Sequence, residues 1–243
     1  MNYRDFKSIE PFLIKSTIQR NFVSNETDME LESAYFPVGA VLSVVAMMED
    51  GQGIETCTIG RENAFGLANA LGSPCTVEQA ICQIPGDCYH LPISRLRRAA
   101  SESRTLTELL IRHIQASQAQ ISQAAACNAL HTVEARLCRY LLMSQDRAAQ
   151  DILPLTQEFL GFMLGVQRTT VTAAAHHLQA AEVIRCRRGH IEILDRAQLE
   201  AGACECYAAA IARHARFFED YPGREDRGIA GHRFGLGGAL VAT

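Results

Sequence analysis

The chain has 243 residues, of which 48% are hydrophobic and 21% charged, and its formal net charge is −4. This composition is that of a globular protein with one large or two smaller domains. The small negative charge excludes a protein that binds nucleic acid through overall basicity, so such binding would need a local basic patch.

The first half of the sequence predicts a small β-structure. Residues 1–24 carry a weak helical pattern, and between residues 31 and 91 strand-forming stretches alternate with turns at 49–53, 60–63 and 85–87. Many short strands at regular spacing indicate a small antiparallel barrel or a double-sheet roll.

A long helix is predicted next, from about residue 106 to residue 128. One stripe of this helix has intervals of 4, 3, 4, 3 and 4 residues, the heptad pattern of a helix that pairs with a second copy. The residues of this predicted dimerisation stripe are Leu110, Ile114, Ser117, Ile121, Ala124 and Asn128. Because only three of the six are large and apolar, a helix that packs on its own domain is the alternative.

A hinge is expected at 130–132, where Thr132 can cap a following helix over about 133–147. That helix buries an apolar face and presents Arg136 and Arg139 outward. A loop at 148–154 then leads to the next pair of helices.

Residues 155–180 predict two short helices joined by a glycine turn. Thr156 is a candidate N-cap, apolar residues recur at helical spacing up to Leu164, and Gly165 interrupts the pattern before a second helix at Gln167 or Arg168. This arrangement lets a second helix lie in a DNA major groove, whereas a helical hairpin that only packs is the alternative. The expected buried side of the second helix is Val171, Ala174, Ala175 and Leu178. The expected outward residues are Arg168, Thr169, Thr172, Ala173 and His176.

A basic hairpin follows the second helix. Strand-forming residues at 183–186 and 191–194 flank the sequence Arg187-Arg188-Gly189-His190, which predicts a tight turn. The tip could be a solvated turn, but two adjacent arginines beside a helix-turn-helix favour contact with phosphates. Asp195 is expected to cap a final helix that runs to about residue 217, and the glycine-rich residues 219–243 are expected to form a flexible tail.

The nine cysteines are scattered, odd in number and contain no Cys-x-x-Cys pair, which favours free thiols in a reducing cytoplasm. Cysteines in predicted strands are usually small core residues, so a redox or cluster role is disfavoured for them. Cys204 and Cys206, considered with His214, would point to different faces of one helix, so we predict no metal site.

No P-loop, Gly-x-Ser-x-Gly or His-Glu-x-x-His motif supports an enzyme. The sequence shows no signal peptide and no apolar run long enough to cross a membrane.

The order of roll, long helix, hinge, helix-turn-helix and basic wing resembles the Crp/Fnr superfamily of bacterial transcription regulators. The similarity is carried by Leu-Thr-Gln-Glu-Phe-Leu-Gly at 155–161 and Gly-Val-Gln-Arg-Thr-Thr-Val at 165–171. It implies an α+β fold with an antiparallel, cyclic-nucleotide-binding-like roll at 1–104, a dimerisation helix and hinge at 105–130, and a winged helix-turn-helix at 131–218.

The resemblance implies a homodimer that reads a palindromic operator in double-stranded DNA, with RNA polymerase as a candidate partner. By position, Arg168 contacts a guanine; Thr169 stands where many members carry an acid and Ala173 where many carry a second arginine, so a different half-site is expected. The predicted DNA-binding residues are Thr156, Gln157, Gln167, Arg168, Thr169, Thr170, Thr172, Ala173, His176, Arg187, Arg188 and His190.

The resemblance also bears on the effector. Members that bind a cyclic nucleotide carry a Gly-Glu-Leu/Ile segment followed by Arg-Ser/Thr-Ala, whereas residues 64–72 and 76–80 here contain no such arginine and include Glu78. The Fnr branch gathers its cluster-binding cysteines at the N-terminus, whereas the first cysteine here is Cys57. We therefore expect no cofactor and an unknown effector. The alternative function is a small-molecule or redox sensor that acts mainly through a protein partner.

Overall fold

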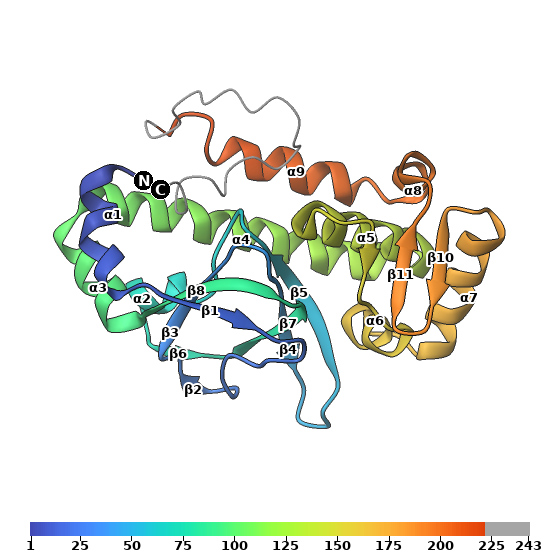
Figure 1. Cartoon of the computed structure of the whole chain (residues 1–243), viewed down its shortest axis with the longest axis horizontal. Coiled ribbons are helices and arrows are strands. Elements are labelled where there is room, and N and C mark those ends of the chain that lie inside the picture. Colours follow the sequence, from blue (N-terminus) through green and yellow to red (C-terminus); the bar gives the residue numbers. More distant parts are fainter. Residues whose placement is uncertain (222–243) are drawn as a thin grey trace.

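A computed structural model describes residues 1–221 (Figure 1). The predicted tail therefore lies outside the described residues from 222 onward. The architecture is the predicted α+β one, with a β-roll and a winged helix-turn-helix connected by a long helix.

The N-terminal roll consists of small antiparallel sheets, with the strand orders β1-β8-β3, β5-β4-β7 and β2-β6. Its strands are β1 (Ile14–Ile18), β2 (Met29–Glu30), β3 (Ser33–Pro37), β4 (Val41–Met47), β5 (Gly53–Ile59), β6 (Cys75–Thr76), β7 (Glu78–Ile84) and β8 (Gly86–Pro92). The valine-rich β4 lies in the centre of its sheet, paired with β5 through a hairpin and with β7 on its other edge. This confirms the predicted roll, whose β-branched residues suit a pleated, half-buried surface.

Short helices accompany the roll: α1 (Tyr3–Ile9), the 3-10 turn Glu10–Phe12, α2 (Leu67–Leu71) and α3 (Ile93–Glu102). Figure 1 shows α1 and α3 at the end of the molecule opposite to the winged helix. Among the described residues, no helix has both the length and the apolarity that crossing a membrane requires.

The long helix α4 extends over Arg104–Leu130, and the predicted dimerisation stripe faces the chain's own roll. Leu110 belongs to the roll's core, Ile114 and Ile121 pack against that core, and Ser117 accepts a hydrogen bond from Asn63 at 2.8 Å. Ala124 is buried, and Asn128 ends the stripe half-exposed. The alternative interpretation, packing on its own domain, therefore describes Leu110, Ile114, Ser117 and Ile121, whose side chains contact the roll.

The hinge and the next helix, α5 (Val133–Ala148), begin where they were predicted, with the Thr132 hydroxyl accepting a hydrogen bond from the Ala135 amide. The outward placement of Arg136 and Arg139 is wrong, because both side chains are buried. Arg136 donates to the carbonyl of Leu164, and Arg139 donates to Met143 Sδ at 3.2 Å. The apolar pattern predicted one buried face, whereas α5 is enclosed on several sides by the roll and by the helices that follow.

The expected single C-terminal helix is two helices, α8 (Arg196–Gly202) and α9 (Cys206–Arg216). Asp195 caps α8 as predicted, by accepting from the Gln198 amide at 3.0 Å. The helix then ends because Ala203 is extended, and α9 turns back to lie along α4 (Figure 1). The cysteines at 204 and 206 therefore do not lie on one helix, and the argument that separated their side chains is wrong.

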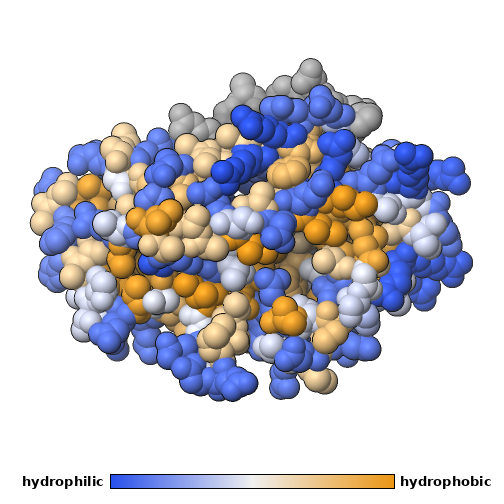
Figure 2. Space-filling view, turned by 180° about the vertical axis from the view of Figure 1, so that it is seen from behind, coloured by the Kyte–Doolittle hydropathy of each residue, from blue (hydrophilic) through white to orange (hydrophobic). Residues whose placement is uncertain are grey.

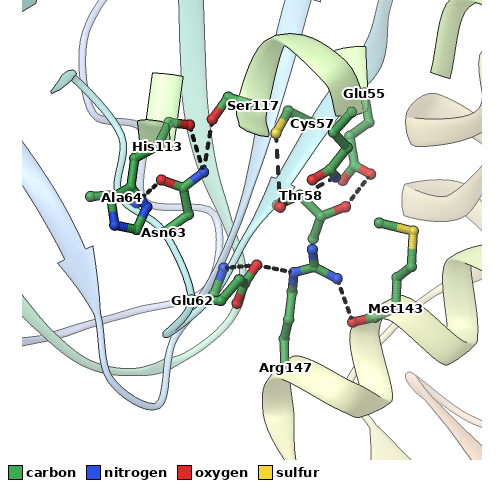
Figure 3. Close-up of polar contacts among 12 residues, drawn as sticks. Glu55, Cys57, Thr58, Glu62, Asn63, Ala64, His113, Ser117, Met143 and Arg147 are labelled. Atoms are coloured by element: carbon green, nitrogen blue, oxygen red, sulfur yellow. Dashed lines mark hydrogen bonds and ion pairs between the residues drawn. The ribbon is translucent and has the colours of Figure 1, made fainter. Parts of the chain in front are cut away.

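A buried ion pair fastens α5 to the roll (Figure 3). The Arg147 guanidinium lies 2.7 Å from the Glu62 carboxylate, and the two side chains are only 5% and 3% exposed. Glu62 also accepts from the Gly60 amide at 3.2 Å, and Arg147 donates to the Met143 carbonyl at 3.1 Å. The roll residues Val41, Val45 and Ile84 share one hydrophobic cluster with α5, so the two halves of the chain have a continuous core.

We expect Arg147→Met to lower the free energy of unfolding by about 3–5 kcal/mol, because it leaves the Glu62 carboxylate buried without its counter-charge. Urea unfolding followed by circular dichroism measures this change. Arg104→Met is the control, because Arg104 pairs with Glu108 in solvent and should have little effect. Adding Glu62→Leu to Arg147→Met should recover part of the loss; no recovery would contradict the role of the pair.

The environment of His113 predicts sensitivity to acid. Its ring lies 4.6 Å from that of Phe218, and desolvation lowers its pKa to about 3. An unfolded histidine titrates near about 6.5, so the unfolded state binds the proton first. Stability should therefore be fully present above about pH 6.5 and be lost progressively as the pH falls from there.

Urea midpoints between neutral and mildly acidic pH measure this effect. His113→Gln should flatten the pH dependence, whereas His176→Gln, a change at an exposed site, should leave it unaltered. Equal pH dependence in the His113 variant and the parent protein would show that His113 is not responsible.

Candidate nucleic-acid interface

The helix-turn-helix forms because its ends are capped locally. In α6 (Gln157–Leu164), the Thr156 hydroxyl accepts from the Phe159 amide at 3.1 Å, as predicted for the N-cap. Gly165 adopts φ +63°, which ends α6 and turns the chain into α7 (Arg168–Ala180). A side chain at Gly165 would also meet Ile54 Cδ1 at 2.7 Å, so glycine is required both by the backbone and by the β4–β5 hairpin.

The second helix buries the side that the sequence predicted, which is Val171, Ala174, Ala175 and Leu178. The opposite side is open to solvent. It presents Gln167, Arg168, Thr169, Thr170, Ala173 and His176. We call this set of residues the α7 face. It is the side of a second helix that can enter a major groove.

Thr172 and Gln157 are less available than the sequence indicated. Both are half-buried, and the Thr172 hydroxyl donates to Gln157 Oε1 at 2.8 Å. The pair links the start of α6 to α7. This hydrogen bond fixes the angle between α6 and α7. The two side chains border the exposed α7 face.

The two adjacent histidines on α7 have different environments. His177 lies 3.0 Å from the Glu134 carboxylate of α5, within the same domain. His176 points to the open side and has no ion pair among the described residues. Only His176 therefore belongs to the α7 face.

The predicted wing is the hairpin of β10 (Ile184–Arg187) and β11 (His190–Ile193), extended by β9 (Ile152–Leu153). Figure 1 shows this hairpin beside α7, at one end of the molecule. Arg187, Arg188 and His190 are exposed at its tip.

The arginines of the wing differ in their partners. Arg185 pairs with Glu192 at 2.9 Å, and Arg187 lies 4.0 Å from the same carboxylate. Within residues 1–221, neither Arg168 nor Arg188 forms an ion pair. Among the arginines of α7 and the wing, these two are therefore the most available to an anionic ligand.

The roll segment around α2 is where the resemblance to Crp/Fnr regulators would place a nucleotide pocket. Arg97 donates to the carbonyls of Asn69, Ala70 and Gly72, at the C-terminal end of α2. Its charge is thus used to cap a helix. At the other end of α2, Gly66 has φ +88°, and a side chain there would meet Leu31 Cδ2 at 2.6 Å.

One further group of potential ligands was missed by the sequence analysis. Cys127, His131, Cys204 and Cys206 have ligand atoms that all lie within 4.8 Å of one another. The i,i+4 spacing of Cys127 and His131 was the available signal. Cys204 and Cys206, for which the sequence analysis predicted no metal site, are thus in a cluster, whereas His214 lies apart with its ring 5.0 Å from that of Phe218.

Comparisons with known proteins agree with this geometry. Residues 135–201 match the family model of the Crp-like helix-turn-helix domain. A search of curated protein sequences finds no match.

Several solved structures have a similar fold. A Crp/Fnr family regulator from Eubacterium rectale is 16% identical over 83% of this chain and 94% of its own, with a TM-score of 0.67. FixK2 from Bradyrhizobium japonicum is 18% identical over 79% of this chain and 98% of its own, also with a TM-score of 0.67. A CRP family regulator from Thermus thermophilus is 20% identical over 77% and 96%, with a TM-score of 0.66. The chain therefore carries a Crp-like helix-turn-helix domain within a fold similar to that of Crp/Fnr family regulators.

Proposed function

We propose that the protein is a homodimeric, sequence-specific transcription regulator that binds double-stranded DNA through the α7 face and the wing. The main support is that Arg168 and Arg188 lie on neighbouring elements, are exposed and have no ion pair among residues 1–221. Phosphate contacts from the wing would fix the register, and Arg168 would read a base edge. This surface is that of a transcription regulator rather than of an enzyme. We expect the protein to act in the cytoplasm.

The predicted residues divide by their roles. Arg168 can form a bidentate pair with guanine, which contributes about 1–3 kcal/mol of discrimination. Arg187, Arg188 and His190 suit phosphates, as do the exposed Thr170 and the N-terminal edge of α6 at Thr156 and Gln157. The small side chains of Thr169 and Ala173 leave the middle of the α7 face without a charge, so the operator should differ from those read by two arginines.

The proposed dimer interface is a different side of α4 from the predicted dimerisation stripe. With the roll on one side of α4 and α9 on another, a third side remains open. Its exposed residues again have heptad spacing and are Ile111, Gln115, Gln118, Ser122, Ala125 and Ala129. Small and amphiphilic side chains allow two helices to approach closely, and a dimer would place two α7 helices at half-sites about 34 Å apart. Figure 2 shows hydrophobic side chains in a band across the middle of the rear face, with hydrophilic ones around them.

We propose that no cyclic nucleotide controls the protein. The support is chemical: Arg97, which contacts α2, donates to carbonyl groups, and strand β7 carries Glu78, which would repel a phosphate. A sensor that acts through a protein partner is the alternative. It has no need of the unpaired Arg168 and Arg188, and it would give DNA binding that hardly depends on salt. RNA polymerase remains a candidate partner on the promoter.

Selection of bound sequences from a random DNA pool should yield a palindrome, and Arg168→Ala should abolish discrimination at one guanine per half-site. The expected loss is about 5–150-fold in preference for that base, equivalent to about 1–3 kcal/mol. Fluorescence anisotropy with the selected operator and a guanine-substituted copy measures it.

Arg188→Ala is the matched control for this experiment. It should weaken binding to all sequences alike and make the dependence of log affinity on log salt less steep by about one phosphate contact. If selectivity survives Arg168→Ala intact, α7 is not the reading helix; if the parent protein shows a flat salt dependence, the DNA-binding proposal itself is wrong.

We expect Ala125→Glu to convert the dimer to a monomer, because it places a charge in the middle of the open side of α4. Sedimentation equilibrium measures the mass, and operator affinity should fall with it. Ala212→Glu, the same change at an exposed position of α9, should leave the dimer intact. An Ala125→Glu protein that remains dimeric would locate the interface elsewhere.

A further inference from the structure

Four potential metal ligands meet where the long helix ends. Cys127 lies in the last turn of α4, and His131 is the residue directly after that helix. Cys204 lies in the turn between α8 and α9, and Cys206 is the first residue of α9. Because the chain reverses there, with the Tyr207 amide donating to the Cys204 carbonyl at 3.1 Å, both cysteines can reach the same point.

The separations are those of ligands around one ion. Cys127 Sγ lies 3.5 Å from Cys204 Sγ, and Cys206 Sγ lies 3.5 Å from His131 Nδ1. Two sulfurs bonded to a tetrahedral zinc at about 2.3 Å are about 3.8 Å apart. Since all four ligand atoms lie within 4.8 Å of one another, the cluster has room for a single ion. An iron–sulfur cluster would hold the thiolates farther apart, because its iron and sulfide core lies between them.

The groups around the ligands also suit a metal. His131 Nε2 lies 3.1 Å from the Glu205 carboxylate, so that nitrogen can carry the proton and leave Nδ1 directed at the cysteines. The carboxylate–histidine–metal arrangement is the usual way in which a ligating imidazole is oriented. Gln123 Nε2, in turn, donates to Cys206 Sγ at 2.9 Å, as expected for a thiolate sulfur.

Two buried arginines supply the charge that such a site needs. Three thiolates and a divalent ion leave one net negative charge. Arg136 and Arg139 are 5% and 8% exposed, have no ion pair among the described residues, and each has a buried Nε without a hydrogen-bond partner. Both lie on α5, which begins directly after the hinge residue Thr132, so their positive charges would offset an anionic metal centre.

A reactive thiol pair fits less well. Redox-sensing cysteines are exposed and have a lowered pKa. Cys127, Cys204 and Cys206 are only 0%, 8% and 1% exposed. A closed set of three sulfurs and one imidazole is instead the donor set of a structural zinc site.

We propose that Cys127, His131, Cys204 and Cys206 bind one zinc ion, which fastens the end of α4 and the hinge to the α8–α9 turn. The ion would replace three thiol protons and link the long helix to the DNA-binding domain. That the ion thereby fixes the separation of two α7 helices rests on the proposed function, whereas zinc binding does not.

The test is the metal content of the full chain, purified under reducing conditions without chelator. Mass spectrometry of the elements should find one zinc per chain. Cys204→Ser should lose the zinc, and Cys75→Ser, a change at an exposed cysteine of the roll, should retain it. Chelator-stripped parent protein should bind Co²⁺ with the visible absorption of a tetrahedral thiolate complex, and His131→Ala should change that spectrum.

Glu205→Gln avoids the risk that a ligand variant fails to fold, because the Glu205 side chain is 78% exposed. It should bind zinc about 10–100-fold more weakly in competition with a chromophoric chelator. Unchanged zinc affinity in this variant would remove the assigned role of Glu205.

Three results would overturn the site. One is reduced, folded protein that binds neither zinc nor cobalt. Another is equal zinc in the Cys204 and Cys75 variants. The third is a Cys127–Cys204 disulfide in protein purified without reductant that takes up no zinc after reduction. Because operator binding is measured separately, zinc without DNA binding would refute only the proposed function, and DNA binding without zinc only the metal site.

Discussion

The buried contact between Arg147 and Glu62 is the constraint on which the arrangement of the two halves depends. A charged pair removed from water tolerates little displacement, because separating the charges in a low-dielectric interior is costly. It fixes the last turn of α5 against the roll, and near it the Tyr140 hydroxyl donates to Gln83 of the roll. Helix α5 is therefore the common element of the two halves, and the residues around it belong to one core.

This sharing of α5 changes how the domains are understood. The boundary at 130–131 is real in the secondary structure, because α4 ends there and α5 begins. The packing, however, continues across it: the β4–β5 hairpin meets the helix-turn-helix directly, with Ile54 against Gly165 and Phe162 against Gly53. A displacement of the hairpin would be felt at the turn that sets the direction of α7. A change in the roll would therefore alter the orientation of α7 through this contact.

The long helix α4 also has a divided environment. The roll covers one side, α9 covers another, and the third is open. The cysteine and histidine cluster lies at its C-terminal end, where α4, the hinge and the α8–α9 turn come together. A metal there and the ion pair at Arg147 would act at opposite ends of α5. Together they would hold the winged helix in one orientation, with the α7 face turned to solvent.

The sequence by itself determined the elements whose signals are local. The N-caps at Thr132, Thr156 and Asp195, the glycine turn at 165 and the buried side of α7 were all predicted, because each depends on neighbours within a few residues. Four results needed the tertiary structure: the direction of the α4 stripe, the burial of Arg136 and Arg139, the break at 203–205, and the meeting of Cys127 with Cys204. The first, second and fourth of these depend on contacts between residues far apart in the chain. Helical periodicity indicates that a face is buried without indicating which part of the protein covers it.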